Sequence, residues 1–474
     1  MLSGFPVFYR LNDLAIRQWD EARNAVSAVE MYQNKNHIVR YFDHSPDYWD
    51  VKPPLLIWAQ DLCIGLLGVN ELSVRLPSAI AVMLTIVFLI FYFHKYQHNR
   101  YAGYIAALIL ATSQGYMDRH IARTGDHDAL LVLFTTMILF LFYEFMKNKN
   151  TKLLFILMLL LVAGVYTKSI AVMMIMPGMI VMALLNKKLI PLLTNKWFYI
   201  NLFIFIAVCL SYYLIRNKMQ PGYLKAVWTG ELLPRYLNTY NEFNKDPGLY
   251  YVKNLFHERF TYWIFMLVPA IFWQLFQYRR EKQGIFLYIL INAVVFMVII
   301  SMGTKNLWYD APLYPLFAVL IALWIIILVK LLKEKLHFKP VFKNILVIVL
   351  IVSLVIYPYI KIVKKAGMQK EEFWNEEIYA MSYVLRDLSA YPDLLNREFS
   401  VVYEGYSGHL LFYIRQHEIK GNAQISLKNK ENIKPGDYIL ISQELLNKEI
   451  KAGFRTEVLF QQNRVVLYKI NDVL

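Results

Sequence analysis

The sequence predicts an all-α polytopic membrane protein with about eleven spans, the first incomplete, followed by a soluble C-terminal α/β domain. Three observations support this fold class. The 474 residues are 57% hydrophobic and only 18% charged, and the mean hydropathy is +0.36, which is typical of integral membrane proteins. Several windows with almost no charge are long enough to cross ~30 Å of hydrocarbon. Beyond residue 363 the composition becomes mixed polar and apolar, as in a soluble domain.

The spans are expected in order along the first three quarters of the chain. Met1–Tyr9 is interpreted as the end of a first span whose beginning is missing, and residues 55–69, interrupted by Asp61 and Gly65, as a helix lying along the membrane surface. The remaining spans are expected at 75–95, 102–115, 128–146, 153–167, 169–186, 197–215, 262–278, 284–301, 311–332 and 341–360.

Basic residues predict the orientation of these spans. They gather in alternate connections, which the positive-inside rule places in the cytoplasm: 95–100, 147–152, 187–196, 279–282 and 330–339. The first loop (10–74) and the loop after residue 115 would then lie outside a cell inner (cytoplasmic) membrane, as would everything after 361. We therefore predict a membrane domain at 1–363, which includes the outer first loop, and an extracytoplasmic α/β domain at 364–474.

The net charge of +15 is explained by this topology and by contact with anionic membrane lipids, so no nucleic-acid partner is predicted. In the C-terminal domain, strand-like runs occur at 399–403, 438–442, 457–461 and 465–470, and helix-like stretches at 372–388 and 408–417. Cys63 and Cys209 lie in separate apolar stretches, which excludes a disulfide framework or a zinc cluster of cysteines.

The first outer loop carries acids and bases close to the membrane. Asp20, Glu21 and Arg23 are followed by Asp50 and Lys52, which precedes two prolines. A carboxylate can accept a proton from an attacking hydroxyl group while Arg or Lys neutralises a phosphate leaving group. An ordinary solvated loop with an acidic helix cap is the alternative.

The second outer loop is also densely polar. It contains His120, Arg123, Asp126 and His127 and ends at Asp128, where a span begins. Asp128 could be a helix cap favoured by the helix dipole. The two histidines could bind a metal together with carboxylates, but their spacing fits no metal-binding motif. A divalent metal is thus possible, and no cofactor is certain.

Two lysines lie where the outer membrane boundary is expected. Lys168 stands between two apolar runs with scarcely any loop around it, and Lys305 lies beside Trp308 and Tyr309. A charge at this depth is costly unless it reaches water or has a partner, and an anionic lipid phosphate would be a suitable one. The aromatics beside Lys305 could instead form an interfacial belt.

Taken in order, these residues resemble a known family. The pattern resembles the multi-pass C-type (GT-C) glycosyltransferases, nearest to the protein O-mannosyltransferases and the lipid A aminoarabinose transferases. The resemblance covers roughly residues 10 to 320, and its specificity comes from the order of the set. The matching pieces are Asp20-Glu21-x-Arg23, Lys52-Pro53-Pro54, Arg75-Leu76-Pro77, Arg123-Thr124-x-x-x-Asp128, Tyr166-Thr167-Lys168 and Lys305-x-x-x-Tyr309-x-x-Pro312-x-Tyr314-Pro315.

The resemblance implies a function and a role for each matching residue. The chain would transfer a sugar from a polyprenyl-phosphate lipid to a lipid, glycan or protein acceptor. Asp20 would be the catalytic acid of the first loop, with Asp128, or Asp126 as its near alternative, as the second. Arg23, Lys52 and Lys168 would bind the donor phosphate, and Tyr309 would lie near the donor site. From their positions in the sequence, Lys305 is added as a phosphate-binding candidate, and Glu21 and Arg123 as candidates that line the donor and acceptor cavity with Tyr309.

The chain departs from the family pattern at two places. The family often has an acid immediately before the lysine of Lys-Pro-Pro, in some members a metal ligand, whereas this chain has Val51 there and Asp50 one position earlier. Asp50 and His120 are therefore the candidate metal ligands. The expected first span is also largely absent.

Two other function classes are compatible with a polytopic fold. A transporter or lipid flippase needs polar groups through the depth of the membrane, whereas the ionisable residues here collect at one face. A structural scaffold that binds a partner through its C-terminal domain leaves the clustered loop charges unexplained. Glycosyl transfer is the function class that accounts for these clustered loop charges.

Overall fold

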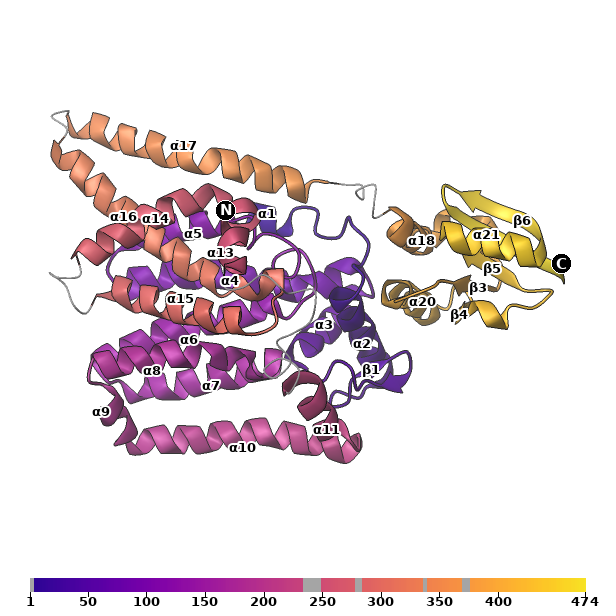
Figure 1. The fold of residues 1–474 in the computed structure, drawn as a ribbon, viewed down its shortest axis with the longest axis horizontal. Helices are drawn as coiled ribbons and strands as arrows, with labels where there is room; N and C mark the ends of the chain where they lie inside the picture. The colour runs from indigo at the N-terminus through magenta and orange to yellow at the C-terminus, as the bar shows by residue number, and fades with distance from the viewer. Residues whose placement is uncertain (1–3, 233–248, 278–283, 336–338, 369–375) are drawn as a thin grey trace. The chain divides into compact units, whose positions relative to one another are not determined.

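The computed structural model describes residues 4–232, 249–277, 284–335, 339–368 and 376–474, and Figure 1 shows the arrangement of its elements within each unit. The chain forms two compact units. The first comprises the residues up to Tyr9, 48–56 and 78–367, and the second comprises 10–47, 57–77 and 368–474. The last boundary between the two units falls after Gly367, whereas the sequence predicted the start of a separate domain at 364. Most of the first outer loop, however, belongs to the same unit as the C-terminal residues rather than to the membrane helices.

The first unit is helical, and its long helices correspond to the predicted spans. Seven helical stretches in the described residues are long and apolar enough to cross a membrane. The shorter apolar helices of this unit are α5 (Arg100–Ala111) and α14 (Thr261–Gln277), and α1 (Phe5–Phe8) is one turn. α3 (Leu55–Leu67), also apolar, belongs to the second unit from residue 57 onward. The long stretches are α4 (Glu71–Lys95), α6 (Asp128–Asn148), Thr151–Leu185, α10 (Lys196–Met219), α15 (Ile285–Met302), α16 (Leu313–Lys335) and α17 (Pro340–Ala366).

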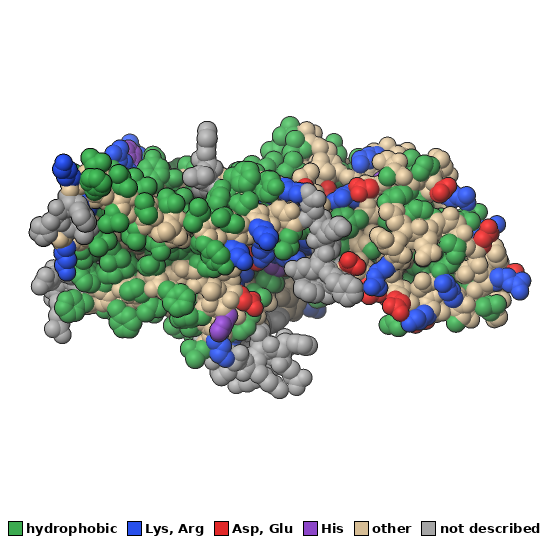
Figure 2. All heavy atoms as spheres, turned by 90° about the horizontal axis from the view of Figure 1, so that it is seen from above, with side chains coloured by type: hydrophobic (Ala, Val, Ile, Leu, Met, Phe, Trp, Pro, Cys, Tyr) green, Lys and Arg blue, Asp and Glu red, His purple; other side chains and the backbone are tan. Residues whose placement is uncertain are grey.

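These helices differ in how much of their surface meets other helices. Most of α6 is buried against its neighbours, whereas α10 and α17 are largely exposed. In Figure 2 hydrophobic side chains dominate the visible surface over the long helices. Apolar surface of this extent is unfavourable in water, and on helices long enough to cross a bilayer it agrees with a membrane location. Of the predicted basic connections, 279–282 lies outside the described residues.

The stretch from Thr151 to Leu185 reverses its direction. It consists of α7 (Thr151–Lys168), η1 (Ser169–Ile175) and α8 (Met176–Leu185). Ser169 has a positive φ of 49°, and a Cβ on Gly164 would lie 2.6 Å from Val172 Cγ2. The chain therefore folds back tightly after Lys168, at the point where the sequence predicted an outer turn.

The second unit contains a five-stranded sheet with the order β4-β3-β5-β7-β6. β3 is parallel to β4 and β5, whereas β7 is antiparallel to β5 and β6. The four strands predicted from the sequence are present. β4 was not predicted, because a four-residue strand with Ser and Lys in it has little apolar signal. The strands are β3 (Phe399–Val402), β4 (Ile425–Lys428), β5 (Tyr438–Ile441), β6 (Phe454–Gln462) and β7 (Val465–Val473).

The helices of the C-terminal region belong to the same unit as this sheet. They are α18 (Glu376–Arg386), α19 (Pro392–Leu395), α20 (Gly408–Lys420) and α21 (Glu444–Gly453). The prediction of a helix at 408–417 is confirmed as α20. The predicted helix at 372–388 coincides with α18 from residue 376 onward, and its first four residues lie outside the described part of the chain.

The first outer loop completes the core of this unit. It forms α2 (Asp20–Asn34) and a short hairpin of β1 (Tyr41–Phe42) and β2 (Ser45–Pro46). Ala25 and Val29 of α2 share one hydrophobic cluster with Leu410 and Ile414 of α20 and with Leu440 of β5. This shared burial explains why the loop groups with residues 368–474 and not with the spans.

A buried ion pair fixes the start of the loop. Arg75 donates from Nε and Nη2 to both carboxylate oxygens of Glu21, at 2.7 and 3.0 Å. It also donates to the backbone carbonyls of Leu11, Leu14 and Ala15 at 2.8–2.9 Å. Because both side chains are almost fully buried, these bonds replace the water that the charges lose.

Replacing Arg75 by Met should destabilise the protein strongly, because Glu21 and three carbonyl groups would stay buried without their donor. Breaking a buried pair in this way typically costs about 3–5 kcal/mol. We expect a clear fall in the melting temperature of the purified protein. As a control, Lys448→Met removes the exposed pair with Glu444 and should cost about 0–1 kcal/mol. Equal melting temperatures for the two variants would contradict this assignment.

Candidate active site

A lysine–aspartate pair joins the facing ends of two long helices in the first unit. Lys168 is the last residue of α7, and Asp128 is the first residue of α6. The Lys168 Nζ atom donates to Asp128 Oδ1 at 2.6 Å, and the exposed fractions of the two residues are only 5% and 4%. Lys168 Nζ also lies 5.1 Å from the ring centroid of Tyr309, a cation–π distance.

The same three side chains line a cavity of about 440 Å³. Apart from Asp128 and Lys168, its walls are formed mainly by apolar side chains of α6, η1 and α15, and by the segment that leads to α16. This volume is in the range of ligand pockets. The other lining residues are Leu131, Ala171, Met174, Phe296, Ile299, Ile300, Met302, Gly303, Thr304 and Pro312. A charged pair at an otherwise apolar cavity suits a ligand with an anionic head and a hydrocarbon tail.

Lys305 and Arg123 occupy different surroundings. Lys305 is half-buried and follows Thr304, a lining residue of the cavity. Arg123 donates from Nη1 to the carbonyl of Tyr9 at 2.9 Å and more weakly to those of Pro6 and Val7. It therefore holds the N-terminal segment, a structural task that the sequence did not reveal.

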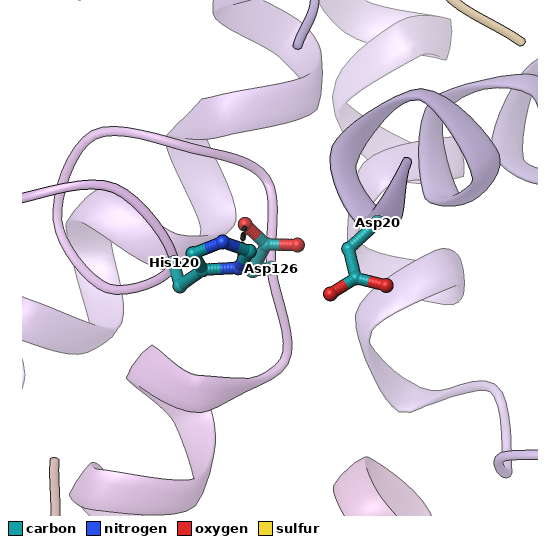
Figure 3. Close-up of side chains that lie close together, drawn as sticks. All are labelled: Asp20, His120 and Asp126. Atoms are coloured by element: carbon teal, nitrogen blue, oxygen red, sulfur yellow. Dashed lines mark ion pairs between the residues drawn. The ribbon is translucent and has the colours of Figure 1, made fainter. Parts of the chain in front are cut away.

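The second outer loop places a histidine beside an acid. His120 Nδ1 lies 3.4 Å from Asp126 Oδ2, and Figure 3 shows this contact as a dashed line. The Asp126 carboxylate accepts from Thr124 Oγ1 at 2.5 Å, and the His120 ring stacks on Trp308 at 3.5 Å between ring centroids. Both side chains are thus fixed in place, and His120 and Asp126 could share a metal as well as a proton.

The Lys-Pro-Pro segment is anchored to the end of α10. Lys52 Nζ donates to Asp50 Oδ1 at 2.9 Å, so the candidate metal ligand Asp50 already neutralises a cation. The hydroxyl of Tyr223, in α11 (Tyr223–Val227), donates to the carbonyl of Val51 at 2.7 Å. Arg216 donates to the carbonyl of Lys52 at 3.4 Å. The segment is therefore ordered by contacts on both sides of the lysine.

The remaining candidates belong to the second unit. Asp20 is exposed in the first turn of α2 and is also labelled in Figure 3. Glu21 is buried in the ion pair with Arg75, which gives it a structural task. Arg23 forms a two-pronged pair with Asp47, from Nη2 to Oδ1 at 2.7 Å and from Nε to Oδ2 at 2.9 Å. Such a fork fixes the guanidinium plane.

Sequence reasoning missed the partners of these residues and one buried cluster. Arg259 Nε lies 3.3 Å from Asp310 Oδ1, and the Tyr314 hydroxyl donates to Asp310 Oδ2 at 2.8 Å. Burial raises the pKa of Asp310 to about 6, and the Arg259 guanidinium opposes that shift. A buried acid beside an aromatic run was visible in the sequence, but its partner lies 51 positions earlier in the chain and gave no signal.

Comparison with known proteins confirms the resemblance and the fold. Residues 51–215 match the family described as dolichyl-phosphate-mannose-protein mannosyltransferase. An uncharacterized protein of Aquifex aeolicus is 23% identical over 352 residues, which cover 70% of this chain and 68% of that protein.

Two solved structures share the fold at low sequence identity. ArnT from Cupriavidus metallidurans bound to undecaprenyl phosphate superposes with a TM-score of 0.73 and 14% identity over 98% of this chain and 96% of ArnT. The oligosaccharyltransferase AglB from Archaeoglobus fulgidus in complex with dolichol-phosphate and an inhibitory peptide gives 0.57 and 12%, over 98% of this chain and 73% of AglB. The chain thus has the GT-C fold, and the predicted fold class is confirmed.

Replacing Lys168 by Met should destabilise the first unit, because Asp128 would remain buried without its counter-charge. The double variant Lys168→Met/Asp128→Asn removes both charges and should recover much of the lost melting temperature. A double-mutant cycle on the purified protein measures this coupling. Additive losses from the two single variants would show that the pair does not form.

Proposed function

We propose that this chain is a glycosyltransferase that moves a sugar from a polyprenyl-phosphate donor to a lipid A, glycan or protein acceptor on the outer face of the cytoplasmic membrane. The observation that carries the proposal is the Lys168–Asp128 pair at a cavity with otherwise apolar walls. That combination matches the chemistry of a lipid phosphate, whose head is anionic and whose chain is hydrocarbon.

The lysine can serve such a head group without leaving its aspartate. An ammonium group has three N–H donors, and Asp128 takes one of them at 2.6 Å. Another can donate to a phosphate oxygen, in surroundings where a charge-assisted bond is strong because little water competes for it. The likeness in fold to ArnT and AglB, whose structures contain undecaprenyl phosphate and dolichol-phosphate, supports the same donor class here.

Neutralising the phosphate makes it a better leaving group. As the acceptor oxygen bonds to the anomeric carbon, the bond from that carbon to the phosphate oxygen breaks, and polyprenyl phosphate departs with both electrons. Positive side chains stabilise the charge that grows on the departing oxygen. We assign this task to Lys168 first, with Lys52 and Arg23 as further cations carried over from the family and Lys305 as one assigned from its position beside the cavity.

Asp20 is the proposed general base. Its exposed carboxylate can accept the proton of the acceptor hydroxyl as that oxygen attacks, and a direct displacement inverts the anomeric centre. Asp128 is less suited to this task, because Lys168 holds its carboxylate. We therefore assign Asp128 to the orientation of Lys168 and keep Asp126, beside His120, as the alternative acid.

A transporter or flippase is the second candidate, and the distribution of charge disfavours it. The Lys168–Asp128 pair lies at the ends of α7 and α6 and not halfway along them. A translocation path needs polar groups through the depth of the membrane. Lipid binding without sugar transfer is the result that would favour this candidate.

The proposed orientation places the C-terminal domain outside the cytoplasm, because α17 follows the basic connection at 330–339. Alkaline phosphatase fused in the loop after Gly436 should be active, and a cytoplasmic fluorescent reporter at that position should be dark. Fusions in the basic connection at 187–196 should give the opposite pattern. The reverse assignment would place the proposed chemistry on the wrong side of the membrane.

Asp20→Asn should abolish most of the transfer activity while leaving donor binding intact, since the amide keeps the size of the side chain but cannot accept the proton. A positioned base contributes roughly 10²–10⁴-fold, so we expect turnover to fall at least about a hundredfold. Transfer of radiolabel from polyprenyl-phosphate sugars to cell-envelope acceptors measures it. The control is Asp393→Asn, another exposed acid in the first turn of a helix, which should behave like the parent protein.

A binding measurement with polyprenyl phosphate separates the two tasks. The charge-neutral variant Lys168→Met/Asp128→Asn should lose affinity for this lipid, whereas Asp20→Asn should retain it. Full turnover in Asp20→Asn together with its loss in Asp126→Asn would move the catalytic acid to the second outer loop. Binding without transfer in the parent protein, with every donor and acceptor tried, would contradict the enzyme assignment.

A further inference from the structure

The residue immediately before Asp20 has an unusual backbone conformation. Trp19 is the N-cap of α2, with φ 71° and ψ −115°, and its side chain makes no capping hydrogen bond. A bulky residue seldom adopts a positive φ, because its Cβ then crowds the backbone. Such a conformation persists only where surrounding contacts enforce it. In this chain it fixes the direction in which the first turn of α2, and with it Asp20, leaves the preceding segment.

The enforcing contacts come from the C-terminal region of the same unit. The Trp19 ring stacks on Tyr406 with 4.6 Å between centroids and 5° between planes. Gln18 Nε2 donates to the Tyr406 carbonyl at 2.8 Å, and the Gln18 N–H donates to the Tyr379 hydroxyl at 3.1 Å. The Tyr406 hydroxyl lies 3.4 Å from the Trp19 carbonyl oxygen as a weak donor. Gln18 and Trp19, the two residues before Asp20, are thus held by residues 361 to 388 positions later in the chain.

Tyr406 is itself held in place. A Cβ on Gly408 would lie 2.7–2.9 Å from atoms of the Tyr406 phenol, so a larger residue at position 408 would force the ring to shift. Burial raises the pKa of Tyr406 to about 12, with Arg23 nearby opposing the shift, and the hydroxyl therefore stays a neutral donor. The loop between β3 and α20 thus leaves space for the Tyr406 ring in the position where it stacks on Trp19.

We propose that Tyr406 is a positioning residue for the transfer reaction: by stacking on Trp19 it holds the strained backbone ahead of Asp20 and so aims the Asp20 carboxylate. This inference rests on the proposed function and assigns a task in the reaction to the C-terminal α/β domain. Its physical basis is that a catalytic group displaced by about 1 Å can lose ~10²-fold in rate.

The test compares substitutions that remove, keep or bypass the stack. Tyr406→Ala should lower kcat at least about tenfold with an unchanged KM for the donor, because positioning of the base acts on the transition state. Tyr406→Phe keeps the ring and should stay close to the parent protein. Trp19→Gly removes the strained backbone conformation as well as the stack. This variant should therefore be at least as stable as the parent protein and should still lose turnover. A merely structural contact would not produce that combination.

The matched control lies in the same unit. Tyr391 packs against Phe460 with 5.3 Å between ring centroids, so Tyr391→Ala removes an aromatic contact without touching Trp19. Turnover in Tyr406→Ala equal to that in Tyr391→Ala would overturn the proposal. The expected result is a selective loss in Tyr406→Ala, with rescue in Tyr406→Phe.

A second readout does not depend on activity. The N–H groups of Ala22 and Arg23 donate to the carbonyls of Arg17 and Trp19 at 3.0 and 2.9 Å, so their hydrogen exchange reports the first turn of α2. Tyr406→Ala should speed this exchange at least about tenfold, and Tyr391→Ala should not. If the parent protein transfers no sugar, the proposed function fails while the exchange still decides whether Tyr406 holds this turn. Unchanged exchange would refute the positioning role in either case.

Discussion

The structure depends on one constraint: a charged side chain that leaves water must keep its counter-charge or hydrogen-bonding partners. Lys168 meets this requirement with Asp128, Arg75 with Glu21, and Arg259 with Asp310. Each pair joins segments far apart in sequence. Because breaking any of them leaves a buried charge uncompensated, the pairs determine which arrangement of loops and helices is stable.

The same constraint shapes the proposed chemistry. A lysine at an apolar cavity would be costly without a counter-charge, and the contact with Asp128 supplies one and fixes the direction of the side chain. Tyr309 adds a ring face 5.1 Å from the ammonium. A donor phosphate would then meet a cation already oriented toward its site, so little reorganisation is needed as charge develops on the leaving oxygen. Arg23, forked on Asp47, and Lys52, beside Asp50, follow the same principle.

Much of the fold was predictable from local signals. The long apolar helices, the shorter helix at Leu55–Leu67 and four of the five strands of the C-terminal sheet follow from hydropathy and periodicity, which are short-range properties. Lys168 was also recognisable as unusual, because a lone charge between apolar runs needs an explanation. Its pairing with Asp128, the burial of Glu21 on Arg75 and the structural use of Arg123 were not predictable, because each depends on tertiary contacts. The grouping of α2 with α20 escaped prediction for the same reason.

That grouping has a consequence for biosynthesis. Residues 10–47 leave the ribosome long before residues 368–474, yet the hydrophobic cluster they share with Leu410 and Leu440 cannot close until those later residues have been made. While the membrane helices insert one after another, the part of α2 that packs against α20 stays uncovered. Late closure over so large a sequence separation is slow and leaves a nascent chain open to misfolding. A chain whose synthesis stops early therefore differs from a finished one in a physical property: the shared hydrophobic cluster of this unit stays open.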